Sequence, residues 1–180
     1  MNKIEITFNA LKALYNSTNG SGWNYDRGWD SINPPYTMKG FNDWFNVWVV
    51  DGKLTHLHLS KNHLEGTIPP EIGDLIDLEI LFLDGNYLTG TLPPEIGKLT
   101  NLKELYLDHN HLTSTIPSEF GNLTNLEALT LDHNYLTGVV PIEIEKLVHL
   151  KRFNITRNCN LFRTYIPSEE ESDTTKSLSK

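Results

Sequence analysis

The sequence is poor in cysteine, in positive charge and in long apolar runs, and each shortage excludes a class of protein. Its 180 residues hold a single cysteine, Cys159, so an intrachain disulfide framework and zinc sites built on paired thiolates are both excluded. Lysine and arginine total 15 against 23 acidic residues, giving a net charge of −8, which argues against binding nucleic acid or an anionic membrane through charge. No apolar stretch approaches the length of a membrane span.

The start of the chain does not resemble a secretory signal, because Lys3 and Glu5 alternate with Ile4 and Ile6. We therefore expect a soluble protein that does not insert into a membrane. It is cytoplasmic, or extracellular if a signal peptide has been removed, and the sequence leaves the compartment open. A chain of this length is sufficient for one domain with a sizeable core, which we expect to be monomeric and to need no cofactor.

Leucine recurs at a fixed period, and this repeat determines the expected fold. Four consecutive units of 24 residues share the pattern L-x-x-L-x-L-x-x-N-x-L and begin at Leu54, Leu78, Leu102 and Leu126. A fifth unit begins at Leu150 but places Ile166-Pro167 two residues too far from Asn158, so we interpret it as a degenerate terminal repeat. Units of this kind bury their apolar faces only by stacking on their neighbours, and such an array needs caps.

Each unit predicts one turn of a right-handed solenoid. Leu81 and Leu83 flank one outward residue, as the period of two in a strand requires. Asn86 follows the strand and is expected to turn its amide onto the backbone, and its counterparts predict a buried asparagine ladder: Asn62, Asn110, Asn134 and Asn158. Gly90 permits a tight bend, and Pro93 prevents a continuing helix. The expected fold is α/β, with a parallel β-sheet on the concave face.

The repeats span residues 54–167, and the segments before and after them are considered separately. Residues 1–53 are expected to form an N-terminal cap, because Phe8, Leu11, Leu14 and Tyr15 fall at helical spacing. The cap also holds all four tryptophans, which we expect to cover the open end of the leucine stack, with a carbohydrate platform as the alternative: Trp23, Trp29, Trp44 and Trp48. Residues 168–180 are polar and acidic, and we expect them to be disordered.

The motifs of the array resemble leucine-rich repeats of the class typical of plant receptor kinases, receptor-like proteins and polygalacturonase inhibitors. The second halves of the units carry this class's pattern G-x-[IL]-P-x-E-[IF]-G-x-L, and the front end resembles its cap at Gly20-Ser21-Gly22-Trp23 and Trp44-Phe45-Asn46-Val47. Asn46 stands where the cap motif has glycine, and the paired cap cysteines are absent, so the chain resembles a cysteine-poor variant. The resemblance implies the solenoid fold and binding of proteins or peptides through the strand face.

The strand register places the outward residues in columns spaced about 4.8 Å apart. The candidate partner-binding residues lie on these columns or directly after them: His56, Ile80, Glu104 and Arg152; His58, Phe82, Tyr106, Thr130 and Asn154; Asp84, Asp108 and Asp132; His109 and His133. Phe82, Tyr106 and Ile80 form a central apolar patch flanked by charge, which is typical of an interface hot spot. The alternative is that the two rings only stabilise the sheet by packing side to side.

The ladder of Asp84, Asp108 and Asp132 needs compensation, because like charges at strand spacing repel one another. The structural interpretation is that each aspartate accepts backbone N–H bonds at the turn. The functional alternatives are a docking strip for basic side chains or a weak Ca²⁺ site. His109 and His133 stand beside the ladder, but no rigid ligand spacing supports a metal, and we expect none.

A second regular series of rings follows the asparagines. His63, Tyr87, His111 and Tyr135 are expected to be half-buried and to shield the asparagine ladder.

A shallow strand face lacks the water-poor pocket with an activated nucleophile or paired carboxylates that an enzyme needs. We therefore predict a recognition module rather than an enzyme, with a receptor-like or signalling role and a protein or peptide partner. An inhibitor of a secreted cell-wall glycosidase is the alternative. Ice binding is a further alternative, because a Thr-x-Thr pattern recurs at the repeat period in Thr89-Gly90-Thr91 and Thr113-Ser114-Thr115.

Overall fold

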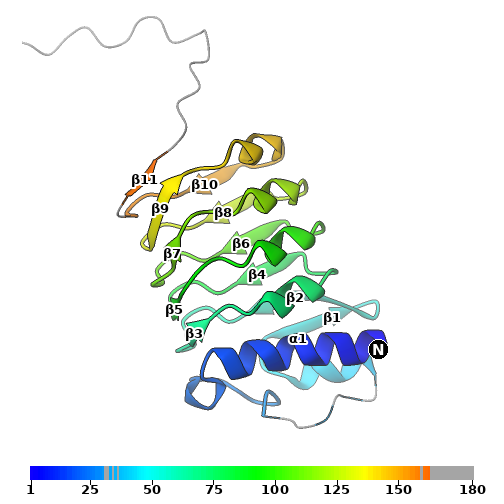
Figure 1. The fold of residues 1–180 in the computed structure, drawn as a ribbon. Coiled ribbons are helices and arrows are strands. Elements are labelled where there is room, and N and C mark those ends of the chain that lie inside the picture. The colour runs from blue at the N-terminus through cyan, green and yellow to red at the C-terminus, as the bar shows by residue number, and fades with distance from the viewer. Residues whose placement is uncertain (31–32, 34, 36, 159, 163–180) are drawn as a thin grey trace, which may run out of the picture.

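The protein is an elongated stack of coils with one long helix across its N-terminal end (Figure 1). The computed structural model describes residues 1–30, 33, 35, 37–158 and 160–162. The expectations for Cys159, for Ile166-Pro167 and for the acidic tail 168–180 lie outside these residues.

The N-terminal helix α1 (Lys3–Ser17) confirms the predicted amphipathic segment. Its first turn is closed by a capping box, in which the Asn2 side chain accepts a bond from the Glu5 N–H (2.9 Å) and the Glu5 carboxylate accepts one from the Asn2 N–H (3.0 Å). Leu11 and Leu14 are buried, and the helix packs on the 3₁₀ helix η3 (Pro70–Asp74) of the first repeat. The helix therefore covers the leucines that the first coil leaves open.

Three of the four cap tryptophans are buried together, as expected. Trp29 lies between Trp23 and Trp44, with ring centroids 4.8 and 5.3 Å away, and its indole N–H donates to the Phe45 carbonyl (3.0 Å). The short 3₁₀ helices η1 (Gly20–Gly22) and η2 (Met38–Asp43) carry the chain around this cluster. For Trp48 the expectation is wrong, because this side chain is 42% exposed and lies on strand β1 (Val47–Val50).

The concave face is a six-stranded sheet in the order β1-β2-β4-β6-β8-β10. Strand β1 runs antiparallel to β2, and all the other neighbours are parallel. One strand comes from each repeat: β2 (Lys53–His58), β4 (Ile80–Phe82), β6 (Glu104–Tyr106), β8 (Ala128–Thr130) and β10 (Arg152–Asn154). His56, Ile80, Glu104, Ala128 and Arg152 are in register, which confirms the predicted columns.

A second set of short strands closes another side of the coils. These strands are β3 (Glu65–Thr67), β5 (Tyr87–Thr89), β7 (Thr113–Ser114), β9 (Tyr135–Val139) and β11 (Asn160–Phe162). Strand β3 pairs with β5, and β9 pairs with both β7 and β11. Among the described residues, one isolated bridge, between Thr91 and Thr113, joins the coil of β5 to the coil of β7.

The remaining side is a row of 3₁₀ helices: η3, η4 (Pro94–Lys98), η5 (Ser118–Asn122) and η6 (Ile142–Lys146). The glycine of the E-[IF]-G motif is required here by close packing. A Cβ added to Gly97 would lie 2.4 Å from the Glu119 carbonyl oxygen of the next coil, and Gly73 and Gly121 have equivalent contacts. The motif glycine therefore lets successive coils approach backbone to backbone.

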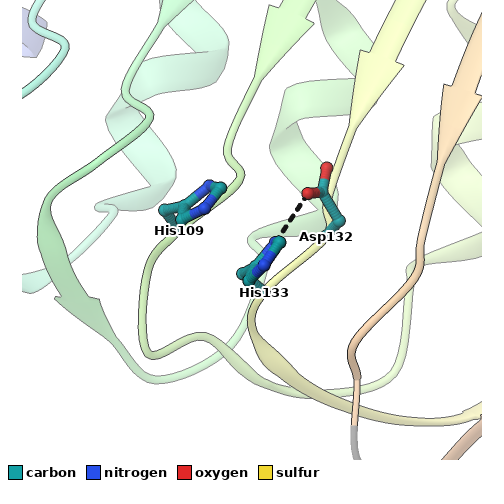
Figure 2. Close-up of side chains that lie close together, drawn as sticks. All are labelled: His109, Asp132 and His133. Atoms are coloured by element: carbon teal, nitrogen blue, oxygen red, sulfur yellow. Dashed lines mark hydrogen bonds and ion pairs between the residues drawn. The ribbon is translucent and has the colours of Figure 1, made fainter.

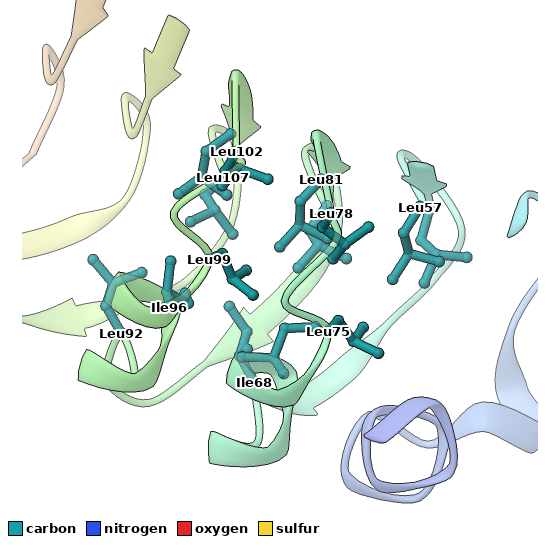
Figure 3. Packing of buried hydrophobic residues seen from close by; sticks show 14 of the residues in the cluster. Leu57, Ile68, Leu75, Leu78, Leu81, Leu92, Ile96, Leu99, Leu102 and Leu107 are labelled. Carbon is teal, nitrogen blue, oxygen red and sulfur yellow. The ribbon is translucent and has the colours of Figure 1, made fainter. Parts of the chain in front are cut away.

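The interior is filled by the repeated leucines, which stack from coil to coil (Figure 3). Leu78, Leu81 and Leu83 are fully buried, as the repeat pattern predicts. The asparagine ladder is also confirmed. The Asn86 amide donates to the carbonyls of Leu83 (2.9 Å) and Leu59 (2.8 Å), and its oxygen accepts the Leu64 N–H (3.1 Å). Asn86, Asn110, Asn134 and Asn158 thus satisfy backbone groups of their own coil and of the preceding one, whereas Asn62 bonds to the backbone of Tyr25 in the cap.

Candidate functional site

The concave face carries a continuous stack of four rings that crosses four neighbouring strands. His58 lies 4.6 Å from Trp48 and 4.6 Å from Phe82, measured between ring centroids, and Phe82 lies 4.4 Å from Tyr106. The His58–Phe82 and Phe82–Tyr106 pairs are nearly parallel, with interplanar angles of 16° and 13°. Phe82 and Tyr106 therefore lie side by side as expected, and Trp48 and His58 extend their stack toward the N-terminus. We call these four residues the ring stack.

Trp48 is the residue of this face that sequence reasoning missed. It was assigned to the cap with the other tryptophans, but β1 adds an antiparallel strand to the repeat sheet and pairs Trp48 with His56. The alternation of a half-buried strand is visible only in the structure, where Val47 and Val49 are buried and Trp48 and Val50 are exposed, because all four residues of β1 are apolar.

His58 is held between two rings and behaves as an aromatic member of the stack. Its Nε2 atom is buried and has no hydrogen-bond partner among the residues that the structure describes. Burial lowers the pKa of His58, and neighbouring His56 lowers it further, against the opposing effects of Glu104 and Asp84. The neutral imidazole is therefore favoured at this position.

The C-terminal half of the face is small and polar. Arg152 reaches across β8, where its Nη1 donates to the Tyr106 hydroxyl (3.4 Å), and beneath it lie Ala128 and Thr130. Thr130 is 7% exposed and donates its hydroxyl to Asp108, so it offers a partner little surface, which corrects its assignment as a contact residue.

Asn154 accepts bonds from the N–H (3.1 Å) and hydroxyl (2.9 Å) of Thr156. Burial raises the pKa of Tyr106, and its hydrogen bond with Glu104 raises it further.

The aspartate ladder is compensated by side chains and not by the backbone. Asp84 accepts a bond from the Ser60 hydroxyl and Asp108 from the Thr130 hydroxyl, while His109 and His133 bond to Asp108 (3.0 Å) and Asp132 (2.7 Å). The backbone N–H groups of the turn bond to carbonyls of the next coil, as in Gly85 N–H to Asp108 O (2.9 Å). The expectation of backbone capping by these aspartates is therefore wrong, since the asparagine ladder performs that role. Asp132 is also buried, with its side chain only 10% exposed.

His109 and His133 form a stacked pair beside this ladder, with ring centroids 3.9 Å apart and an interplanar angle of 16° (Figure 2). The pair borders a hollow of about 460 Å³ that is also lined by Tyr87, His111 and Tyr135. Tyr87 and Tyr135 are 45% and 50% exposed, and His63 and His111 are exposed too. The two tyrosine rings are therefore half-buried, as expected, and the four rings form a stripe with centroid spacings of 5.0 to 6.0 Å.

None of the helices among the described residues combines the length and the apolar character needed to cross a bilayer.

Comparisons with known proteins agree with this architecture. Residues 52–180 match the family model for a leucine-rich repeat region. The protein MALE DISCOVERER 2 of Arabidopsis thaliana is 45% identical over 51 residues, which cover 27% of this chain and 8% of that relative. The chain thus spans a small part of the length of this curated relative.

Solved structures are similar over most of the chain. In the BIR3–SERK2 complex from Arabidopsis thaliana, the matched chain is 28% identical with a TM-score of 0.69, covering 89% of this chain and 85% of that one. A plant ice-binding protein is 29% identical with a TM-score of 0.74, covering 87% of this chain and 49% of that one. With its repeat pattern, its coil geometry and the family model in agreement, this chain belongs to the leucine-rich repeat proteins of the plant type.

Proposed function

We propose that this protein recognises a partner protein or peptide through its concave face, with the ring stack as the main source of binding energy. The observation that carries the proposal is the stack itself. Trp48, Phe82 and Tyr106 present aromatic surface on one side of a sheet whose other side is already filled by leucines. Central aromatic residues with a polar surround carry most of the energy in many interfaces.

The surround of the stack supports specificity. Glu104 and Arg152 lie in register on the column beside the rings, and Asp84 and Asp108 lie just beyond the strand ends. Charges at the rim of an interface guide a partner and reject wrong ones more than they add affinity. One of the matched structures is itself a complex of two proteins, BIR3 and SERK2. These observations support a receptor-like or signalling role, and binding in place of catalysis.

An inhibitor of a secreted glycosidase remains the alternative identity for the same face. It differs only in its target, so the partner recovered by the experiment below distinguishes the two.

The experiment compares partner capture from native extract by the parent, by a Phe82→Arg, Tyr106→Arg variant, and by an Ile76→Arg, Val148→Arg control. The control replaces two exposed apolar side chains outside the strands, so it matches the added charge without touching the face. Circular dichroism confirms that all three are folded. A partner bound by the parent and the control, and lost from the face variant, supports the proposal. A partner bound equally by all three shows that the face is wrongly assigned.

Ice binding is a second candidate function, favoured by the similarity to a plant ice-binding protein and by exposed threonines. Thr89, Thr91, Thr113 and Thr115 are exposed on two neighbouring coils, but Glu65 and Val139 interrupt the array on the coils at either side. Thermal hysteresis of the purified protein is the test, and its absence removes this candidate.

A further inference from the structure

A cluster of metal-ligating side chains lies beside the concave face, outside the ring stack. His109, His133 and Asp132 each place a ligand atom within 4.8 Å of the other two (Figure 2). They belong to two neighbouring coils, and both histidines border the hollow of about 460 Å³. From sequence we expected no metal here, because two histidines 24 residues apart match no known ligand spacing. In the solenoid, residues 24 positions apart occupy equivalent positions of neighbouring coils, so the two rings are in contact.

The backbone explains why the two rings meet. His109 and His133 occupy the same position in consecutive repeats and have the same left-handed conformation, with φ of 54° and 53°. The equivalent positions in other coils are also left-handed and hold Lys61, Gly85 and Arg157. Because the two coils are parallel and have the same backbone conformation at this position, both imidazoles point in the same direction. Their rings therefore stack, with centroids 3.9 Å apart. Histidine occurs at this position in two successive coils, and among the described residues these are the coils that form a ligand cluster.

A carboxylate oxygen lies against one nitrogen of each imidazole. The Nδ1 atom of His133 lies 2.7 Å from Asp132 Oδ2, and that of His109 lies 3.0 Å from Asp108 Oδ2. A carboxylate that holds one ring nitrogen of a histidine fixes the tautomer and raises the basicity of the other nitrogen, as is usual at metal sites. Asp108 is therefore an outer-shell partner of His109, whereas the Asp132 carboxylate beside His133 is counted among the ligands of the ion.

We propose that His109, His133 and Asp132 bind a divalent transition-metal ion of the Zn²⁺ class, with one coordination position open toward the hollow. Two imidazole nitrogens and one carboxylate oxygen form a donor set that Zn²⁺ uses when a fourth position is left to water or to a ligand. Nitrogen donors favour such an ion over Ca²⁺ and Mg²⁺, which prefer oxygen.

Binding requires a small rearrangement. Tetrahedral Zn²⁺ with bonds of about 2.0–2.1 Å brings its ligand atoms to roughly 3.3 Å from one another. The rings are nearly parallel in the structure, so they must rotate to direct nitrogens at a common ion. The hollow beside them leaves room for this rotation, because both rings line it.

The local charge favours a cation. Asp108 and Asp132 bring two negative charges to the histidine pair, while Arg157, which lines the same hollow, brings one positive charge.

The test is isothermal titration of the full chain, first stripped with a chelator, with ZnCl₂ at neutral pH. We expect one Zn²⁺ per chain, and His133→Asn and His109→Asn are each expected to weaken binding at least about tenfold. Asparagine is chosen because it tolerates a left-handed backbone, so the variants keep the turn. The matched control is His63→Asn, which replaces another histidine with positive φ (63°) outside the cluster and is expected to bind as the parent does.

Two further readouts keep the proposal falsifiable. Zn²⁺ is expected to raise the Tm of the parent and of the control more than the Tm of either cluster variant at the same metal concentration, with all four proteins compared first without metal. Histidine ring signals in NMR spectra are expected to shift for His109 and His133 on titration. Absence of stoichiometric binding overturns the proposal, as does binding that survives both cluster substitutions. Equal weakening by His63→Asn places the ion elsewhere and also overturns it.

Discussion

The inner and outer sides of the same strands follow opposite rules. The inner side repeats one residue, with Leu57, Leu81, Leu105 and Leu129 fully buried at the strand centres. The outer side changes at every repeat, from Ile80 and Phe82 on β4 to Ala128 and Thr130 on β8. The inner side must fit the coils above and below it, whereas the outer side has only to maintain a strand. Stability and the proposed recognition therefore depend on different residues of the same strands, and substitutions can separate them.

The largest expected effect comes from the inner side. Leu81→Ala is expected to lower the free energy of unfolding by about 2–5 kcal/mol, because it removes a fully buried side chain from a close-packed stack. Its neighbour on the outer side, Ile80→Thr, keeps a β-branched side chain and is expected to cost no more than about 1 kcal/mol. Urea denaturation of both variants measures the difference. Equal losses would mean that the two sides of β4 are not separable.

The second-largest effect is expected at the asparagine ladder, which follows the strands of the concave sheet. Asn86→Ala leaves the Leu64 N–H and the Leu59 carbonyl without their buried partner, so we expect a loss of at least about 2 kcal/mol, since each buried group left unpaired costs roughly 1–3 kcal/mol.

The control is Asn125→Ala. Asn125 also bonds to the preceding coil, through the Thr100 carbonyl (2.8 Å), but it is exposed, and water can replace it. We expect its substitution to change the unfolding free energy by no more than about 0.5 kcal/mol. Similar losses in the two variants would show that burial is not what makes the ladder important.

The smallest expected effect concerns His58, an outer residue whose ring is partly buried in the stack. Because burial lowers the pKa of His58 in the folded protein, the unfolded chain takes up the proton first as the pH falls. Its stabilising contribution is thus present above the unfolded value of about 6.5 and is lost as the pH falls from there toward the lowered folded pKa.

His58→Phe keeps a ring in the stack and removes the titrating group. Tm measured between pH 7.5 and 5 is expected to fall less steeply for this variant than for the parent, with the remaining slope due to other groups. Identical slopes would show that His58 does not couple folding to pH.

The repeat explains why much of this face could be predicted from sequence. A period of 24 residues and the leucine spacing determine which outward residues are neighbours, so the contact between Phe82 and Tyr106 followed without a structure. Trp48 was not placed, because β1 lies outside the repeat and runs antiparallel to it. Tyr87 is half-buried, as expected, because Asn86 and Leu88 on either side of it are buried and the alternation on β5 places its ring outward.

Other features depend on long side chains that a pattern cannot orient. Arg152 bonds to the Tyr106 hydroxyl two strands away, and Thr130 turns its hydroxyl to Asp108, but the sequence does not show the direction of either side chain. The contact between His109 and His133 depends on a shared left-handed turn after the strand, which the leucine pattern does not report.

The asparagine ladder also gives the solenoid a direction. Each asparagine oxygen accepts an N–H from the preceding coil, as Asn110 does from Leu88 (3.0 Å) and Asn134 from Leu112 (3.0 Å). A coil is thus locked by the coil that follows it, and the last of these locks, from Leu136 to Asn158 (3.0 Å), is only half-buried. Among the described coils we therefore expect opening to begin at this end, with amide hydrogen exchange measured by NMR fastest at Leu136 and progressively slower toward Leu64.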